Sequence, residues 1–174
     1  MRTLSMLFCG LILFNLLILT GCSSKYPKDM PRIYSVSATV QYDDGKPLTN
    51  ASITFLNNDT TFARWICVGT TDANGSAQLR TQGSFDGIPA GDYRVIISAI
   101  LSEGIPYPGE PTSPESEKLY NEWKKNKEKR FSLIDNIYED REKTPLTANV
   151  EKKSNRFVFK VGKELKTSIP TDNP

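Results

Sequence analysis

Residues 34–42 read Tyr-Ser-Val-Ser-Ala-Thr-Val-Gln-Tyr, and apolar and polar side chains alternate along the whole stretch. A period of two places one set of side chains in a core and the other in water, which is typical of a β-strand. Residues 43–47 (DDGKP) follow directly and supply turn chemistry. Residues 51–56 then alternate again, with Ile53 and Phe55 on one side. The pattern predicts two neighbouring strands joined by a turn.

Strand patterns continue along most of the chain. We expect further strands at residues 62–70, 76–81, 92–100, 146–150 and 156–161. Tight turns are expected at Gly45, Asn74, Gly75 and Gly91. The pair Asn74-Gly75 is the strongest short-range signal for a hairpin, with a type I′ turn. A total of about seven strands predicts an all-β, antiparallel sandwich.

One long segment, residues 102–144, departs from the strand-turn-strand pattern. Its first part, 102–114, carries four of the eleven prolines of the chain, too many for regular structure. Residues 115–130 are rich in Glu, Lys and Leu and contain no helix breaker, which predicts a charged helix. Because loops longer than about 12 to 15 residues are usually functional or disordered, we expect any partner specificity to lie in this insertion.

The candidate partner contacts in the insertion are Tyr107, Tyr120 and Trp123. Two arrangements are open. In one, Leu119, Tyr120 and Trp123 rest on the sandwich, and the helix is a lid over a sheet edge. In the other, Trp123 is exposed and available to a partner.

Composition argues against several function classes. The chain has no histidine, which removes the commonest general base and the commonest metal ligand. It carries 22 basic and 20 acidic side chains, so there is no bulk electrostatic case for nucleic acid. Residues 72–75 (DANG) begin like a calcium loop, but Gln82 and Gly83 stand where a further acidic ligand is required. We expect no catalytic residues, no metal and no cofactor.

The first residues have the order of an export signal. Arg2 precedes an apolar run from Leu4 to Leu19 that is short for a membrane span. The four residues 19–22 (LTGC) then resemble the bacterial lipobox. This resemblance implies that residues 1–21 are a lipoprotein signal peptide and that Cys22 is acylated to become the lipid-bearing first residue. Ser23 after the cysteine favours sorting to the outer membrane over the inner membrane.

Two of the three cysteines are accounted for by this leader. Cys9 leaves with the signal peptide and Cys22 takes lipid, so Cys67 stands alone and no internal disulfide is expected. Cys67 lies in an apolar strand, where a thiol is expected to be buried and inert. Its neighbour Trp65 is expected in the core rather than against a ligand.

The order and spacing of several segments carry a family resemblance. They are residues 36–40 (VSATV), 42–48 (YDDGKPL), 51–55 (ASITF), 70–75 (TTDANG), 88–95 (IPAGDYRV) and 138–150, with its TPLT at 144–147. Together they resemble the carboxypeptidase regulatory-like, or transthyretin-like, β-sandwich domains in their bacterial lipoprotein form. The likeness runs from about Ile33 to Val161.

The resemblance implies a seven-stranded transthyretin-like (prealbumin-like) sandwich with one helical insertion. It also implies that the domain acts in binding or in support of folding and not in catalysis. The likeness is to the accessory part of carboxypeptidases and not to their zinc-bearing catalytic part. Transthyretin-like hydrolases of 5-hydroxyisourate use histidine, which this chain lacks.

The expected organisation is therefore a signal peptide (1–21), a tether (22–32), a sandwich (33–165) with an insertion (102–144), and a disordered tail (166–174). We expect a non-enzymatic protein of the cell envelope, anchored by lipid, whose sandwich binds a partner or supports an assembly. The expected partners are the membrane, through the lipid, and an envelope protein or polysaccharide. The alternative is a carbohydrate-binding module at the cell surface, which should show two or three aromatic side chains on one exposed face.

Overall fold

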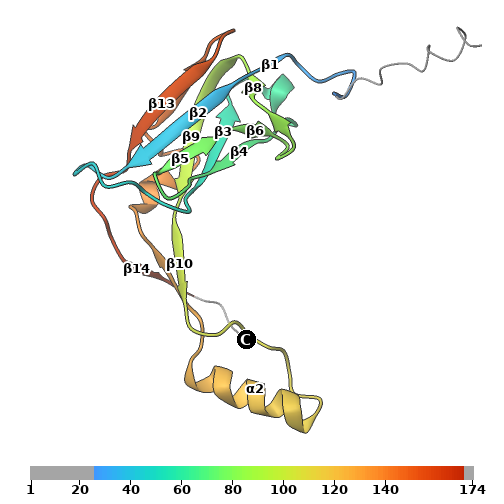
Figure 1. Ribbon diagram of the computed structural model, residues 1–174, viewed down its shortest axis with the longest axis vertical. Coiled ribbons are helices and arrows are strands. Elements are labelled where there is room, and N and C mark those ends of the chain that lie inside the picture. The colour runs from blue at the N-terminus through green and yellow to red at the C-terminus, as the bar shows by residue number, and fades with distance from the viewer. Residues whose placement is uncertain (1–25, 171–174) are drawn as a thin grey trace, which may run out of the picture. The chain divides into compact units, whose positions relative to one another are not determined.

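The computed structural model describes residues 26–170 (Figure 1). The chain divides into two compact units, Met1–Met30 and Pro31–Pro174. Of the first unit only residues 26–30 are described, and they form a turn closed by a hydrogen bond from Met30 N to Pro27 O. The predicted signal peptide, Cys22 and most of the tether lie outside the described residues.

The second unit contains a β-sandwich. Its larger sheet has the order β12-β9-β3-β4-β6-β7 and its smaller sheet the order β13-β2-β5. The larger sheet comprises β12 (Thr147–Val150), β9 (Gly91–Ser98), β3 (Ser52–Asn57), β4 (Cys67–Thr70), β6 (Arg80–Thr81) and β7 (Phe85–Asp86). The smaller sheet comprises β13 (Asn155–Lys160), β2 (Val36–Gln41) and β5 (Ser76–Gln78). A short pair, β1 (Ile33–Tyr34) with β8 (Ile88–Pro89), closes one end.

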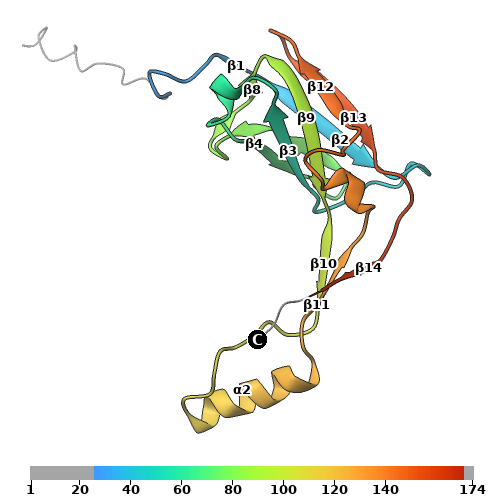
Figure 2. The same cartoon turned by 180° about the vertical axis from the view of Figure 1, so that it is seen from behind.

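The core lies between these two sheets, as the alternation predicted. Burial alternates residue by residue along β2, where Val36, Ala38 and Val40 are at most 1% exposed. Phe55 of β3 meets Phe157 and Phe159 of β13, with ring centroids 5.9 and 6.1 Å apart. These contacts join the two sheets; Figure 2 labels the strands β3 and β13 from which the rings come. The predicted β-rich sandwich with a helical insertion is therefore confirmed.

Two details of the predicted sandwich are wrong. The two sheets hold six and three strands among the described residues, more than the seven predicted, because short strands such as β6 and β7 leave little periodicity in the sequence. The pairing is also not wholly antiparallel, since β13 runs parallel to β2, with Val158 opposite Thr39. The chain crosses from β12 in the larger sheet to β13 in the smaller sheet. This connection sets the direction in which β13 runs beside β2.

The turn at residues 72–75 forms, but it does not make the predicted hairpin. Gly75 has a φ of 72°, whereas Asn74 is not among the residues with positive φ, so the turn is not type I′. The side chain of Asp72 accepts hydrogen bonds from the backbone N–H groups of Asn74 and Ser76 instead. The strands on either side, β4 and β5, belong to different sheets. A local turn signal cannot choose the partner of the returning strand, which here is β2.

The predicted strand at residues 62–70 is shorter than expected. A 3-10 turn, η2, covers Thr60–Phe62, and regular pairing begins only at Cys67. Asp59 caps this turn by accepting a hydrogen bond from the N–H of Thr61, and such local side-chain bonds compete with strand formation.

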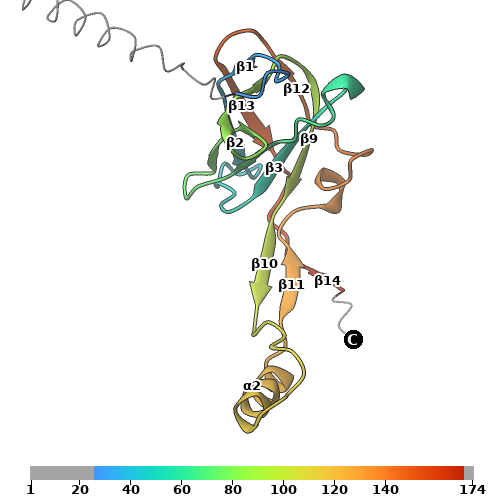
Figure 3. The same cartoon turned by 90° about the vertical axis from the view of Figure 1, so that its right-hand side faces the viewer.

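Two strands at the ends of the helical segment and one from the tail, β14 (Thr167–Ile169), form a separate three-stranded sheet with a helix at its end (Figures 1 and 3). Strand β10 (Ile100–Glu103) continues from β9 after Ala99 and pairs with β11 (Lys129–Ser132). Helix α2 (Pro114–Lys125) joins them. We call β10, β11 and β14 the ribbon, and the segment 104–128 the tip.

Helix α2 begins where the sequence indicated. Ser113 is its N-cap, exchanging hydrogen bonds with Ser116 in a capping box, and Pro114 occupies the first turn. The predicted end at Arg130 is wrong, because the helix stops at Lys125 with Asn126 as its C-cap. Residues 129–132 gain more from pairing with β10 than from extending a solvent-exposed helix.

The predicted disorder of the tail does not hold for residues 167–169, which form β14 (Thr167–Ile169) along β11. Lys166 fastens this strand, since its ammonium lies 2.7 Å from a carboxylate oxygen of Glu103 and 4.6 Å from the ring centroid of Phe131. The edge of β11 that does not pair with β10 is open to a short segment of the tail. No sequence pattern within the tail predicts that it forms a strand there.

Candidate functional site

The three predicted contact residues lie together at the tip. Tyr107 comes from the proline-rich arm, and Tyr120 and Trp123 come from one side of α2. The ring centroids of Tyr107 and Trp123 are 4.9 Å apart, those of Tyr120 and Trp123 5.3 Å, and those of Tyr107 and Tyr120 6.3 Å. We call these residues the tip cluster. Tilted rings at such separations are the favoured arrangement of aromatic side chains.

Backbone hydrogen bonds hold the proline-rich arm against the end of the helix. Ile105 N donates to Asn126 O at 2.8 Å, and Glu128 N donates to Ile105 O at 3.0 Å. Gly104 turns the chain with a φ of 100°, and a Cβ there would lie 2.6 Å from Lys127 O. The arm can therefore approach the helix only because residue 104 is a glycine.

Neither of the two predicted arrangements is observed for Trp123. Its side chain is 3% exposed, so it is not a free contact. It does not rest on the sandwich either, because it packs against Tyr107 and Tyr120. Helix α2, which carries it, lies at the far end of the ribbon (Figure 3). The insertion covers its own apolar side chains. Partner-accessible surface remains on Tyr107, which is 40% exposed, and on Leu119, which is 52% exposed.

Two lysines complete the tip cluster. The ammonium of Lys124 lies 4.4 Å from the ring centroid of Tyr120, and that of Lys127 lies 4.7 Å from the ring centroid of Trp123. Each lysine follows its aromatic partner by four residues. This spacing places Tyr120 and Lys124 on one face of α2, whereas Lys127 lies beyond the C-cap Asn126. Both lysines belong to the segment predicted as a charged helix, but the charge pattern did not predict their contact with the rings. The result is an aromatic surface flanked by positive charge.

The polar atoms of the tip cluster are unequally satisfied. The hydroxyl of Tyr107 donates to a carboxylate oxygen of Glu110 at 2.5 Å. This hydrogen bond to a negative acceptor raises the pKa of Tyr107 to about 12. The indole Nε1 of Trp123, in contrast, is buried without a hydrogen-bond partner in the described part of the chain, which costs stability.

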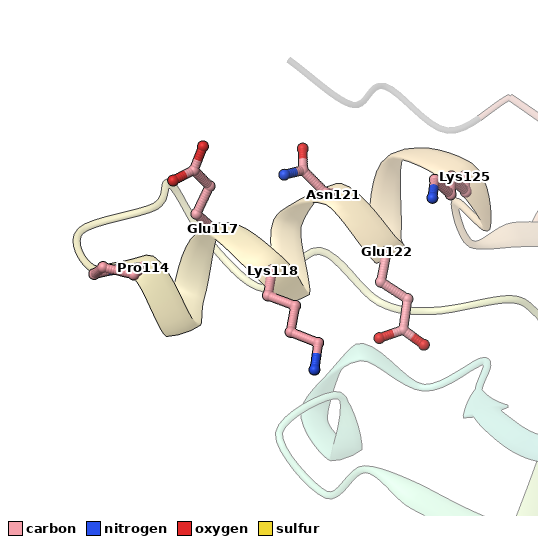
Figure 4. A pocket seen from close by; sticks show the side chains of 6 residues that line it. All are labelled: Pro114, Glu117, Lys118, Asn121, Glu122 and Lys125. Atoms are coloured by element: carbon pink, nitrogen blue, oxygen red, sulfur yellow. The ribbon is translucent and has the colours of Figure 1, made fainter.

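The outer side of α2 carries no comparable cluster. Figure 4 shows its exposed residues, with Glu117 and Asn121 pointing to one side and Lys118 and Glu122 to the other. The residues drawn in Figure 4 line a shallow depression on this side of the helix, and all of them belong to α2. Interspersed charges of both signs are typical of a solvated helical face.

The remaining predicted site residues lie in the sandwich. Gly45 has a φ of 88° and closes a turn, since its N–H donates to Tyr42 O at 3.0 Å. Gly91 also has positive φ, at 150°, but it is the first residue of β9, so a turn at this position is not observed. Cys67 is a buried, free thiol, as predicted, and burial raises its pKa to about 11. Trp65 is 7% exposed, so it is buried as predicted, although it is not a member of the hydrophobic cluster between the two sheets.

No group of three Cys, Asp or Glu side chains placed to hold a metal ion occurs between residues 26 and 170. Within the same range, no helix has the length and apolar character needed to cross a membrane.

Comparisons with known proteins add little. No protein-family model matches the chain, and no curated protein matches it. Among solved structures, a 9R-lipoxygenase from Cyanothece is similar over 80% of this chain and 18% of its own, with 10% identity and a TM-score of 0.33.

Proposed function

We propose that the chain is a non-enzymatic, lipid-anchored protein of a bacterial cell envelope, whose transthyretin-like sandwich presents the tip cluster to another envelope component. The observation that carries this proposal is the tip cluster itself. None of its three aromatic residues belongs to the hydrophobic core of the sandwich. The ribbon and the capped helix therefore hold an aromatic cluster that the sandwich does not need for its own stability.

The exposed surface of the tip suits a protein partner. Tyr107 and Leu119 are exposed next to a buried tryptophan, and Lys124 and Lys127 flank the rings. Aromatic residues backed by well-packed neighbours commonly dominate the binding energy of interfaces. Pre-packing also lowers the entropy lost on association, because the rings are already immobilised.

The anchor and the outer-membrane location are supported by the sequence of residues 1–23. The transthyretin-like topology is supported by the order of the quoted segments and by the sandwich they form. The absence of histidine supports a role without catalysis.

The alternative, a carbohydrate-binding module, requires aromatic rings that lie open on one face. Here Trp123 is 3% exposed and its ring is tilted by 59° against Tyr107 and 33° against Tyr120. The rings pack against each other at these angles and do not form one open, flat face, which favours the protein-partner role. A glycan array probed with the purified chain tests this alternative directly.

The proposed function is tested by removing the tip while keeping the ribbon. Glu103 and Lys129 lie opposite each other at the end of β10 and β11, so an Asn-Gly pair replacing residues 104–128 would close a two-residue hairpin. The variant and the intact chain are expressed in cells, crosslinked and purified from the envelope. We expect the variant to keep its membrane fractionation and its melting temperature while losing the crosslinked partner.

A second variant distinguishes the loss of an exposed contact from the misfolding of the tip. Leu119→Ser changes an exposed side chain of α2 and leaves the tip cluster packed, so it should weaken partner recovery without altering the helix. Recovery of the same partner by the intact chain and by the tip-less variant, with the sandwich folded in both, contradicts the proposal.

A further inference from the structure

A depression of about 190 Å³ lies on the sandwich, away from the tip cluster, where β3 ends beside β9. Six residues line it: Leu56, Asn57, Asn58, Thr60, Arg94 and Arg141. They come from three separate parts of the chain, namely the end of β3 with η2, the strand β9, and the turn that follows η3 (Asn136–Tyr138). The two charged members are both arginines.

The orientation of one arginine is fixed by the other. Nη1 of Arg94 donates to the backbone carbonyl oxygen of Arg141 at 2.8 Å. A guanidinium has five N–H donors in a rigid plane, so one bond to a neutral carbonyl sets its direction and leaves the other donors available. The segment carrying Arg141 is thereby tied to β9, and both arginines are among the residues that line the same depression.

No carboxylate neutralises these arginines. The ion pairs of the described residues involve neither Arg94 nor Arg141. Five acidic residues lie within two positions of a lining residue, at 59, 92, 139, 140 and 142. The carboxylate of Glu139 accepts from the hydroxyls of Ser98 and Ser132, and Glu142 takes part in none of the ion pairs of the described residues. The other three have partners of their own. Asp59 accepts from the N–H and the hydroxyl of Thr61, Asp92 accepts from the amide of Asn149 at 2.6 Å, and Asp140 pairs with Lys143 at 3.0 Å.

We infer that this depression is a binding site for a small oxyanionic group, either a phosphate or a carboxylate. Two guanidinium groups without an acidic partner are matched to the paired oxygen atoms of such groups, which they bind through parallel, charge-assisted hydrogen bonds. The side chains of Asn58 and Thr60, which are exposed at the same depression, offer further uncharged donors. The inference is independent of the proposed role of the tip.

Titration of the purified, isotope-labelled chain tests the inference. Inorganic phosphate, acetate and glucuronate are added separately at constant ionic strength, with chloride as the reference anion. We expect a saturable change in the Nε–H resonances of Arg94 and Arg141 with at least one of the three. The phosphate arm and the two carboxylate arms distinguish the sources of the oxyanion.

Substitutions make the test specific. Arg141→Gln removes one guanidinium but keeps the backbone carbonyl that holds Arg94, and it should weaken binding by about tenfold or more. Arg94→Lys keeps the charge but loses the planar fork, and should also weaken binding. Arg156→Gln, an exposed arginine on β13, makes the same charge change elsewhere and should leave binding within about twofold. Absence of saturable binding by every probe, or undiminished binding by Arg141→Gln, overturns the inference.

Discussion

The ring of Tyr107 packs against the indole of Trp123, with 4.9 Å between the ring centroids. This contact joins the proline-rich arm to α2 and is the centre of the tip cluster. The tip therefore has a small apolar centre of its own, separate from the core between the two sheets.

Replacement of Trp123 by alanine should unfold the tip without unfolding the sandwich. Removal of a buried tryptophan costs about 3 to 5 kcal/mol in well-packed sites, and Trp123 is the buried residue of α2. Hydrogen exchange should show lost protection in Pro114–Lys125 and unchanged protection in β3 and β9. Trp123→Phe, which also removes the unpartnered Nε1–H donor, should cost less. Equal protection of α2 in the alanine variant and the parent contradicts this prediction.

Gly75→Val should destabilise the sandwich, as measured by the melting temperature or by urea unfolding. A residue other than glycine in the left-handed region costs roughly 1 to 2 kcal/mol, and at Gly75 a Cβ would also lie 2.5 Å from Val40 O. Gly45→Val is the control, because its φ is also positive but no atom lies within 4 Å of its Cβ. We expect the loss at Gly75 to exceed the loss at Gly45. Equal losses of unfolding free energy in the two variants would show that the close approach to Val40 O adds nothing to the destabilisation.

Stability should depend on Cys67 at alkaline pH. Burial raises the pKa of its thiol from the ordinary 9.0 to about 11 in the folded chain. Between these values the unfolded chain has lost the proton that the folded chain keeps, so the free energy of unfolding falls as pH rises. Cys67→Ser should reduce this slope, and a thiol reagent at neutral pH should label native Cys67 far more slowly than the unfolded chain. Rapid labelling of the native protein would show that the strand opens.

The anchor prediction concerns Cys22, which lies outside the described residues. Cys22→Ala should abolish acylation and cleavage before residue 22, because the thiol is the atom to which lipid is attached. The variant should retain the precursor mass and lose metabolic labelling by palmitate. An unchanged mass and unchanged membrane fractionation relative to the parent would show that Cys22 is not the anchor.

Local sequence was sufficient wherever a structure depends on near neighbours. The alternation at 34–42 predicted β2 and its buried face, and the burial of Cys67 and Trp65 followed from apolar surroundings. The sequence also determined that glycine is required at Gly75 and that Ser113 and Pro114 begin a helix, because turns and caps are set by a few consecutive residues.

Tertiary structure decided what depends on partners distant in the chain. It placed β5 beside β2 and not beside β4, ended α2 at Lys125, and paired β14 with β11. In each case, a backbone edge far away in sequence offered hydrogen bonds that local propensity does not reveal. The same holds for the two candidate sites. Tyr107 meets Trp123, and Arg94 meets Arg141, only because strand pairing brings together segments that are far apart along the chain.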